Sequence, residues 1–223
     1  MNGRVVVLDL DDTLYDELSY VRSGLRAVAD WGEERLGIDR EDAYARMMAL
    51  LAQQGRGRVF DEWLEGRGSV REALSVYRQH TPTIELWPEA DALLRRLEGR
   101  SVYVVTDGHK GVQWRKAEAL GLPPRIRRVY PTNRYGRHRA KPSPYCFELI
   151  ARRERVAMDR LVHVGDNPAK DFVGLNPLGV TTVRVLTGQH AAVVAAPGAE
   201  AQHRIPSLGH LLPLLDGLPV MQH

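Results

Sequence analysis

Short, continuously apolar segments rich in β-branched residues recur along this chain of 223 residues. The first is VVVL at residues 5–8, which lies inside a predicted strand over residues 4–10. Strands without polar alternation are typical of parallel sheets, because helices cover both faces of such sheets. The other predicted strands span residues 101–105, 126–130, 161–164 and 181–186.

Helical patterns separate the predicted strands in the later part of the chain. They span residues 88–97, 110–120, 144–153 and, more weakly, 169–175. Gly99, Gly121 and Gly179 lie near the ends of such stretches, where glycine commonly terminates a helix. Strands that alternate with helices at this spacing predict an α/β fold with a doubly wound, mainly parallel sheet.

One segment, residues 18–83, shows no strand pattern. Its apolar residues recur at helical spacing in four stretches, which glycine-containing loops separate. We interpret Met47 and Trp63 in these stretches as core residues of a small helical bundle and not as parts of a cofactor pocket. The chain therefore divides into a predicted α/β core domain, residues 1–17 and 84–223, and a helical domain, residues 18–83.

Composition excludes several classes of partner. The formal net charge is +3, and no concentrated basic stripe with stacking aromatics indicates a nucleic-acid partner. No segment approaches the roughly 20 apolar residues of a membrane span, and the start shows no signal-peptide pattern. The single cysteine, Cys146, allows no intrachain disulfide and lies among apolar residues, so we expect a buried side chain in a cytoplasmic protein.

Charged and hydroxyl side chains follow the predicted strands. Asp9 and Asp11 come after the first strand, and Asp166 comes after residues 161–164. The remaining candidates are Thr106, Asp107 and Gly108 after the second strand, Lys141 before a helix, and Asp171. Ligands of parallel sheets bind at the carboxyl ends of the strands, so we expect these residues to converge. Converging carboxylates repel one another unless a cation lies among them, and Mg²⁺ prefers such oxygen ligands beside a phosphate. The set therefore favours phosphoryl transfer.

Four motifs in the order of the chain carry a resemblance to a known family. They are DLDDT at residues 9–13, TDG at 106–108, KP at 141–142 and GDNPAKD at 165–171. They resemble the four motifs of the haloacid dehalogenase superfamily of phosphohydrolases over residues 5–185. Gln113, Lys116 and residues 120–122 resemble the usual continuation of the second motif, and residues 201–215 resemble the closing strand and helix.

The resemblance implies a Rossmann-like core, a first-position helical cap over residues 18–83, and a role for each site residue. Asp9 would be the nucleophile that forms an aspartyl-phosphate, and Asp11 would act as general acid and base. Thr106 and the amides of Asp107 and Gly108 would hold the phosphoryl group, and Lys141 would pair with Asp9 and the phosphate. The Mg²⁺ ligands would be Asp9, the Asp11 carbonyl oxygen, Asp166 and, directly or through water, Asp171.

Several residues near the motifs favour structural interpretations. Asp12 is expected to cap a turn, and His163 to be a hydrogen-bonded core residue. Asp171 could be a helix-surface charge instead of a ligand. Tyr20 and three arginines of the helical domain could reach a substrate, but solvation on helix surfaces is the expectation for each. These arginines are Arg22, Arg56 and Arg58.

The function favoured by the resemblance is an Mg²⁺-dependent phosphatase acting on a small phosphate monoester, such as a sugar phosphate or a nucleoside monophosphate. A phosphoglucomutase-like phosphotransferase shares Asp9 and Asp11 and remains open, as does a non-catalytic binding protein on the same fold. Dehalogenase members lack the second aspartate of the first motif, and Asp11 therefore argues against dehalogenation. A capped site argues against bulky macromolecular substrates. The sequence gives no signal for an oligomeric state.

Overall fold

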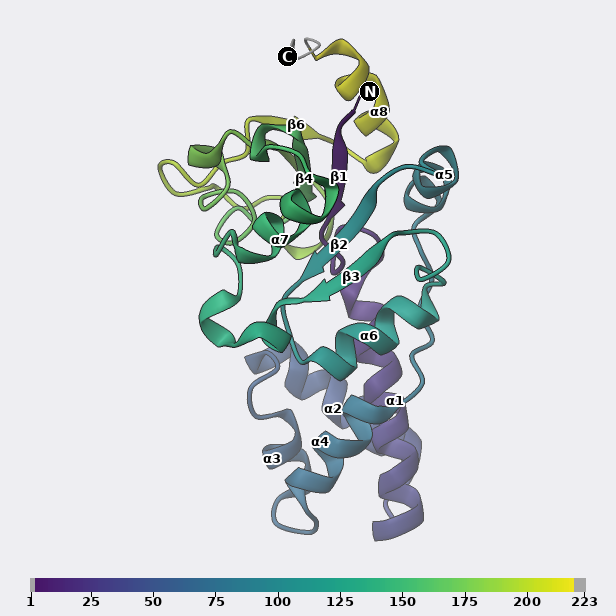
Figure 1. Cartoon of the computed structure of the whole chain (residues 1–223). Helices are drawn as coiled ribbons and strands as arrows, with labels where there is room; N and C mark the ends of the chain where they lie inside the picture. Colours follow the sequence, from purple (N-terminus) through teal and green to yellow (C-terminus); the bar gives the residue numbers. More distant parts are fainter. Residues whose placement is uncertain (1–2, 219–223) are drawn as a thin grey trace. The chain divides into compact units, whose positions relative to one another are not determined.

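The computed structural model describes residues 3–218 of the chain. Six strands form one parallel sheet in the order β3-β2-β1-β4-β5-β6. The strands are β1 (Val5–Leu8), β2 (Val102–Thr106), β3 (Arg128–Pro131), β4 (Leu161–Gly165), β5 (Thr181–Val185) and β6 (His203–Ile205). The order reverses after β3, since β4 returns to the other side of β1 (Figure 1). This topology confirms the predicted doubly wound α/β class.

Helices connect the strands and cover the sheet (Figure 1). In the α/β part they are α5 (Pro88–Arg96), α6 (Lys110–Ala119), α7 (Tyr145–Glu154) and α8 (Leu211–Gly217). Short 3-10 turns are η1 (Thr132–Tyr135), η2 (Arg137–Arg139), η3 (Met158–Arg160), η4 (Asn176–Leu178), η5 (Gly188–His190) and η6 (Leu208–His210). The ends of the predicted core domain, residues 1–2 and 219–223, lie outside the described residues.

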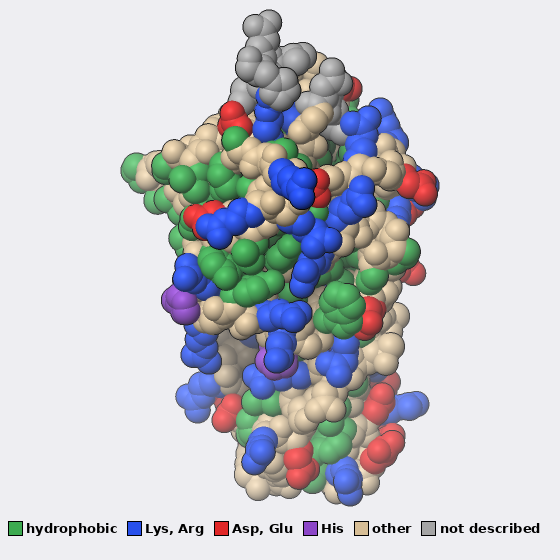
Figure 2. Space-filling model, in the orientation of Figure 1, with side chains coloured by type: hydrophobic (Ala, Val, Ile, Leu, Met, Phe, Trp, Pro, Cys, Tyr) green, Lys and Arg blue, Asp and Glu red, His purple; other side chains and the backbone are tan. Residues whose placement is uncertain are grey.

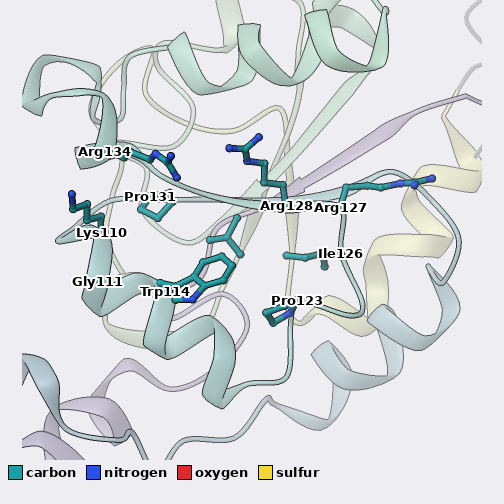
Figure 3. Close-up of a pocket in the computed structure, with 10 residues that line it drawn as sticks. Lys110, Gly111, Trp114, Pro123, Ile126, Arg127, Arg128, Pro131 and Arg134 are labelled. Carbon is teal, nitrogen blue, oxygen red and sulfur yellow. The ribbon is translucent and has the colours of Figure 1, made fainter.

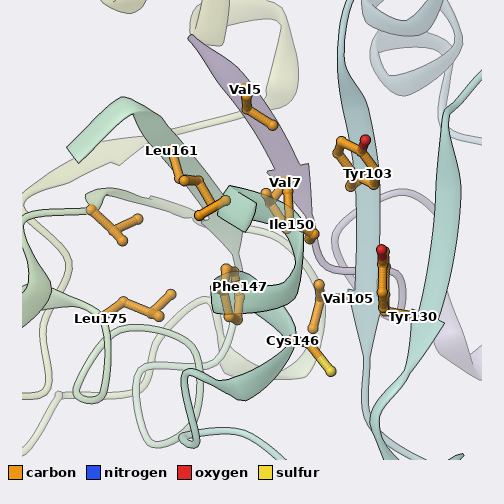
Figure 4. Close-up of a cluster of buried hydrophobic side chains, with 12 residues drawn as sticks. Val5, Val7, Tyr103, Val105, Tyr130, Cys146, Phe147, Ile150, Leu161 and Leu175 are labelled. Carbon is orange, nitrogen blue, oxygen red and sulfur yellow. The ribbon is translucent and has the colours of Figure 1, made fainter. Parts of the chain in front are cut away.

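One face of the sheet packs against α7 (Figure 4). Phe147 and Ile150 of α7 lie against Val7 and Val105 of the central strands. The predicted burial of Cys146 is confirmed, since its side chain belongs to the same cluster. Val6 and other strand residues that point to the opposite face are buried as well. Burial on both faces explains why these strands have no polar alternation.

The chain divides into two compact units, Met1–Glu17 with Glu85–His223, and Leu18–Ile84. The second unit holds α1 (Glu17–Leu36) from Leu18 onward, α2 (Arg40–Gln54), α3 (Val59–Leu64) and α4 (Val70–Gln79). Met47 and Trp63 are buried in its own apolar cluster, as predicted. The expectation that Tyr20 is solvated is wrong, because its ring is buried and packs edge-on against Tyr77.

Two predicted strand boundaries and one predicted helix in the α/β part need correction. The first strand ends at Leu8, because the Leu10 carbonyl accepts the Leu14 amide in a turn. The third begins at Arg128 and not at residue 126, because the Ile126 amide bonds back to Leu122. The helix predicted over residues 169–175 is wrong: the segment forms consecutive turns.

These turns have a simple hydrogen-bond pattern. The Asn167 carbonyl accepts two amides, from Lys170 and Asp171, and the Phe172 carbonyl likewise accepts those of Leu175 and Asn176. Local pairs of bonds of this kind replace the continuous i→i−4 ladder that a helix requires. No described helix is long and apolar enough to cross a membrane.

Candidate active site

The carboxyl ends of β2, β1 and β4 lie side by side in the sheet, and each is followed by a predicted site residue. The Asp9 amide donates to the carbonyl of Val164 in β4 at 2.8 Å, which continues the strand pairing beyond β1. Thr106 ends β2, and Asp166 directly follows β4. The parallel topology therefore brings three segments that are distant in sequence to one edge, as expected.

Three aspartates form a buried cluster at this edge. Asp9, Asp166 and Asp171 each offer a carboxylate oxygen, and these oxygens lie within 4.8 Å of one another. The Asn167 amide donates to Asp171 Oδ2 at 2.9 Å and thereby fixes one carboxylate. A Cβ atom on Gly165 would lie 2.4 Å from the same oxygen, so only glycine leaves room for this arrangement. Asp171 is thus a buried member of the site and not a helix-surface charge.

A buried lysine connects two members of this cluster. Lys141 Nζ donates to Asp9 Oδ1 at 2.5 Å and to Asp171 Oδ1 at 2.6 Å. Asp107 Oδ1 holds the backbone of this lysine, because it accepts from the Lys141 amide at 3.0 Å and from Thr132 Oγ1 at 2.6 Å. The Asp107 side chain therefore positions the lysine segment, a role that the sequence does not predict.

The electrostatics of the cluster follow from burial and crowding. Burial, together with the nearby Asp171 and Asp11, raises the pKa of Asp9 to about 7 although Lys141 opposes the shift. Burial, then Asp9 and Asp171, raises the pKa of Asp166 to about 9. Burial also opposes ionisation of Asp171, but Lys141 and His163 together outweigh it and the pKa of Asp171 falls well below its ordinary value. Asp171 and Asp9 likewise hold the pKa of Lys141 above its usual range against the effect of burial.

The donor set fits a hard divalent cation. When ionised, the three carboxylates with a single ammonium leave excess negative charge in a buried place, and each carboxylate offers an oxygen ligand. Mg²⁺ uses a few carboxylate oxygens and keeps its remaining positions for water and phosphate. Burial is the largest cause of the raised pKa values of Asp9 and Asp166, and the neighbouring carboxylates add to it. A bound cation would oppose both effects, because it stabilises the ionised carboxylates.

Asp11 lies in a separate network directed toward α6. Its Oδ1 accepts from Lys116 Nζ at 2.7 Å and from the Tyr15 hydroxyl at 2.5 Å, and its Oδ2 accepts from Gln113 Nε2 at 2.9 Å. Burial by itself would raise the pKa of Asp11, but the Lys116 charge and the three hydrogen bonds lower it below its ordinary value. The ionised form of Asp11 is therefore the stable one in this network.

Gln113 joins Asp11 to the end of β2. Its Nε2 also lies 2.5 Å from Thr106 Oγ1, so one amide group contacts both predicted site residues. Gly108, with φ of 127°, packs beside the same glutamine, where a Cβ atom would lie 3.2 Å from the Gln113 side chain. Thr106, Gly108 and Asp11 are thus brought together around one side chain of α6.

Two neighbouring residues have the structural roles that the sequence predicted. Asp12 Oδ1 accepts the Glu17 amide at the start of α1, and its Oδ2 accepts the Gln189 amide. His163 is buried, and its ring contacts the Val7 carbonyl and Asp171 Oδ1. Burial lowers the pKa of His163, so the neutral ring is favoured.

Gln113, Lys116 and Tyr15 hold Asp11 or Thr106, and no role for them follows from the sequence patterns. Gln113 and Lys116 are three residues apart on one helix face and belong to the stretch that resembles the continuation of the second motif, and this spacing is a signal for a shared partner. Tyr15 carries no such signal, since its contact with Asp11 depends on the turn that follows β1.

Comparisons with known proteins agree with this geometry. The model of the family described as haloacid dehalogenase-like hydrolase matches residues 4–179. A glyceraldehyde 3-phosphate phosphatase of Methanocaldococcus jannaschii is 28% identical over 197 residues, which cover 83% of this chain and 86% of the relative. A phosphoserine phosphatase of Thermus thermophilus is 30% identical, and the match covers 83% of this chain and 89% of the relative. A ribulose-1,5-bisphosphate 5-phosphatase of Halopiger xanaduensis is 27% identical, with coverage of 95% and 98%.

Solved structures share the fold. A 2-haloacid dehalogenase from Pseudomonas syringae superposes with a TM-score of 0.68 at 24% identity, over 96% of this chain and 98% of the other. A phosphatase from Thermococcus onnurineus superposes with a TM-score of 0.63 at 23% identity, over 97% of this chain and 100% of the other. At this level of identity the superpositions establish the architecture, and the chemistry has to be argued from the site.

Proposed function

This chain belongs to the haloacid dehalogenase-like hydrolases, and we propose that it is an Mg²⁺-dependent phosphatase that hydrolyses a small phosphate monoester. The observation that carries the proposal is the contact of Asp9 with Lys141 inside a buried carboxylate cluster, with a second aspartate, Asp11, two residues further on. The relatives named above are phosphatases for three different small phosphorylated compounds, which supports the substrate class.

The proposed reaction consists of two displacements at phosphorus. A carboxylate oxygen of Asp9 attacks the phosphorus atom, the bond to the ester oxygen breaks, and the alcohol leaves with a proton from Asp11. Water then attacks the phosphorus of the aspartyl-phosphate, Asp11 takes a proton from the water, and inorganic phosphate and free Asp9 result. Splitting hydrolysis in this way replaces one difficult step by two easier ones.

Positioning and charge compensation account for the other residues. The Thr106 hydroxyl and the amides of Asp107 and Gly108 would hold the phosphoryl oxygens, and Lys141 would neutralise part of their charge. Mg²⁺, held by Asp9, Asp166, the Asp11 carbonyl oxygen and Asp171 directly or through water, would neutralise the remaining charge of the phosphate.

The network of Asp11 favours its ionised form, which is the form that accepts a proton from water. Donation to the leaving alcohol requires the protonated form. We infer that Asp11 takes up this proton once its carboxylate turns away from Lys116 toward the substrate. Because a halide leaving group needs no proton, the presence of Asp11 favours an oxygen leaving group over a halide.

Phosphate release tests the proposal directly. The substrates are glyceraldehyde 3-phosphate, phosphoserine, ribulose bisphosphate, AMP and an aryl phosphate, each measured with Mg²⁺ and with chelator. We expect release that requires Mg²⁺ and disappears in Asp9→Asn, and the order of rates identifies the substrate. Release that persists in chelator or in Asp9→Asn would contradict the mechanism.

A further inference from the structure

A groove of about 660 Å³ lies between α6 and β3 in the α/β unit (Figure 3). None of the predicted site residues lines it, so it is distinct from the cluster around Asp9. Its volume falls within the range of cavities that bind small molecules. The groove therefore has room for a ligand other than the one that reaches Asp9.

The floor of the groove is apolar and includes an exposed aromatic ring. Trp114 of α6 is 44% exposed, and Pro123, Ile126 and Pro131 lie around it (Figure 3). Val129 also lines the groove. Trp114 lies on the outward side of α6, whereas its neighbours Gln113 and Lys116 are buried. An exposed indole beside apolar side chains offers a stacking surface for a planar ring.

Cationic side chains border this floor. Lys110 and Arg134 lie at the end of the groove that carries Gly111 and Pro131, Arg127 lies at the other end, and Arg128 points away from the indole (Figure 3). The described lining contains no acidic residue. Lys and Arg side chains also gather on the molecular face that carries α6 and β3 (Figure 2).

Lys110 and Arg134 differ in ion pairing from arginines elsewhere in the same unit. Arg125 pairs with Asp91, and Arg184 pairs with Glu200. Within residues 3–218, by contrast, neither Lys110 nor Arg134 forms an ion pair with a carboxylate. Positive charges that no carboxylate of the protein balances attract an anion from the solution. The anion therefore belongs at the end of the groove that carries Lys110 and Arg134.

We propose that this groove binds a nucleoside phosphate, with the base against Trp114 and the phosphate between Lys110 and Arg134. Stacking on an aromatic side chain and charge-assisted hydrogen bonds to phosphate are the two interactions that such a ligand requires. An added peptide strand fits less well, because the edge strand β3 has only 4 residues and ends in a proline.

The test is calorimetric titration of the full chain with AMP in the presence of chelator, so that binding is measured without hydrolysis. Two comparison ligands each lack one group: adenosine lacks the phosphate, and ribose 5-phosphate lacks the base. We expect saturable binding of AMP and roughly tenfold weaker binding of either comparison ligand, because each loses one of the two interactions. Equal binding of AMP and ribose 5-phosphate would overturn the proposal, and so would the absence of saturable AMP binding.

Variants separate this groove from the cluster around Asp9. Trp114→Ala and Arg134→Glu should each weaken AMP binding about tenfold or more. Arg152→Glu is the charge-matched control, since Arg152 is an exposed residue of α7 outside the groove. AMP binding that both groove variants leave unchanged would assign the nucleotide to another site and reject the proposal. This outcome is independent of whether the chain hydrolyses phosphate esters.

Discussion

At the scale of single residues, the site depends on how each carboxylate is compensated. Lys141 compensates Asp9 and Asp171, and Lys116 compensates Asp11. Asp166 forms no ion pair with a cation within residues 3–218, and burial together with the nearby Asp9 and Asp171 raises its pKa to about 9. These differences give each aspartate a distinct expected response to substitution, pH and metal.

Substitution of Asp9 tests the nucleophile. Asp9→Asn should retain the fold but lose phosphate release by at least about 1,000-fold, because the amide cannot form the covalent intermediate. Phosphate release and thermal unfolding are the two measurements. A variant that keeps both its fold and its activity would refute the covalent mechanism.

Metal binding should be coupled to proton release. With pKa values of about 9 and about 7, Asp166 is mainly protonated and Asp9 is protonated in part near neutral pH when no metal ion is bound. Mg²⁺ has to displace these protons, so its apparent affinity should rise between about pH 6 and about pH 9. Titration calorimetry in buffers of different ionisation enthalpy counts the released protons. An affinity that does not change over this interval would contradict the raised pKa values.

The same shifts predict how stability depends on pH. Both folded-state pKa values exceed the ordinary value of 3.8, so Asp9 and Asp166 bind more protons in the metal-free native state than in the unfolded chain. Their contribution to stability is complete below about pH 4 and is lost as the pH rises through the folded-state values. Mg²⁺ should therefore stabilise the protein more at high pH, which unfolding by urea with and without Mg²⁺ measures.

Removal of Lys116 should expose the cost of an unpaired carboxylate. Lys116→Met should lower the free energy of unfolding by about 3 kcal/mol, because Asp11 keeps its charge and loses its cation. The double variant with Asp11→Asn should recover part of this loss, since the unpaired charge is then gone. Urea unfolding of the single and double variants measures the coupling, and additive losses would show that the pair is not coupled.

At the scale of elements, the turns after β4 position two site segments at once. They carry Asp171, and they bring Gly174 against the backbone that follows Lys141. A Cβ atom on Gly174 would lie only 1.8 Å from the Pro142 carbonyl oxygen. A side chain at this position therefore has to displace the segment that carries the lysine.

Gly174→Ala tests this contact. The variant should lose about 2 kcal/mol or more of unfolding free energy, and phosphate release should fall because Lys141 moves away from Asp9. Gly209→Ala is the matched control, since its Cβ would meet only ordinary contacts at 3.5 Å and 3.7 Å. Equal stability of the two variants would show that the segment that carries Lys141 can move aside without loss of stability.

At the scale of the whole molecule, each compact unit has its own apolar core. The α/β unit is organised around strands such as β1 and β4, and the helical unit around Trp63 and Met47. In the chain the helical unit is inserted between β1 and β2, which supports our proposal that it is a first-position cap. Separate cores imply that the two units respond separately to core substitutions.

A core substitution in the helical unit tests this independence. Trp63→Ala should remove about 4 kcal/mol of stability from the helical unit, because the buried indole leaves a cavity. Hydrogen exchange should accelerate in α1 to α4 and remain unchanged in β1 and β4. Equal acceleration in both units would show that they unfold as one.

Sequence patterns are sufficient to predict which segments are strands and which are helices for most elements. The apolar runs identified five of the six strands, and β6 followed from the family resemblance of residues 201–215. The error at residues 169–175 has a physical origin: the apolar spacing was helical, but tertiary contacts at Gly174 and Asp171 impose turns. Local propensity is a weak determinant where packing constrains the backbone so closely.

By itself, the sequence determined the fold class, the family, and the convergence of Asp9, Lys141, Asp166 and Asp171 at one sheet edge, because strand ends in a parallel sheet lie at a common edge. Only the tertiary structure decided which charges pair. That Lys116 and Gln113 hold Asp11, and that the Asp107 side chain holds the Lys141 backbone, depends on side-chain distances across 105, 102 and 34 residues of sequence separation. Hydrogen bonds act over a few ångströms, so residue spacing along the chain does not specify them.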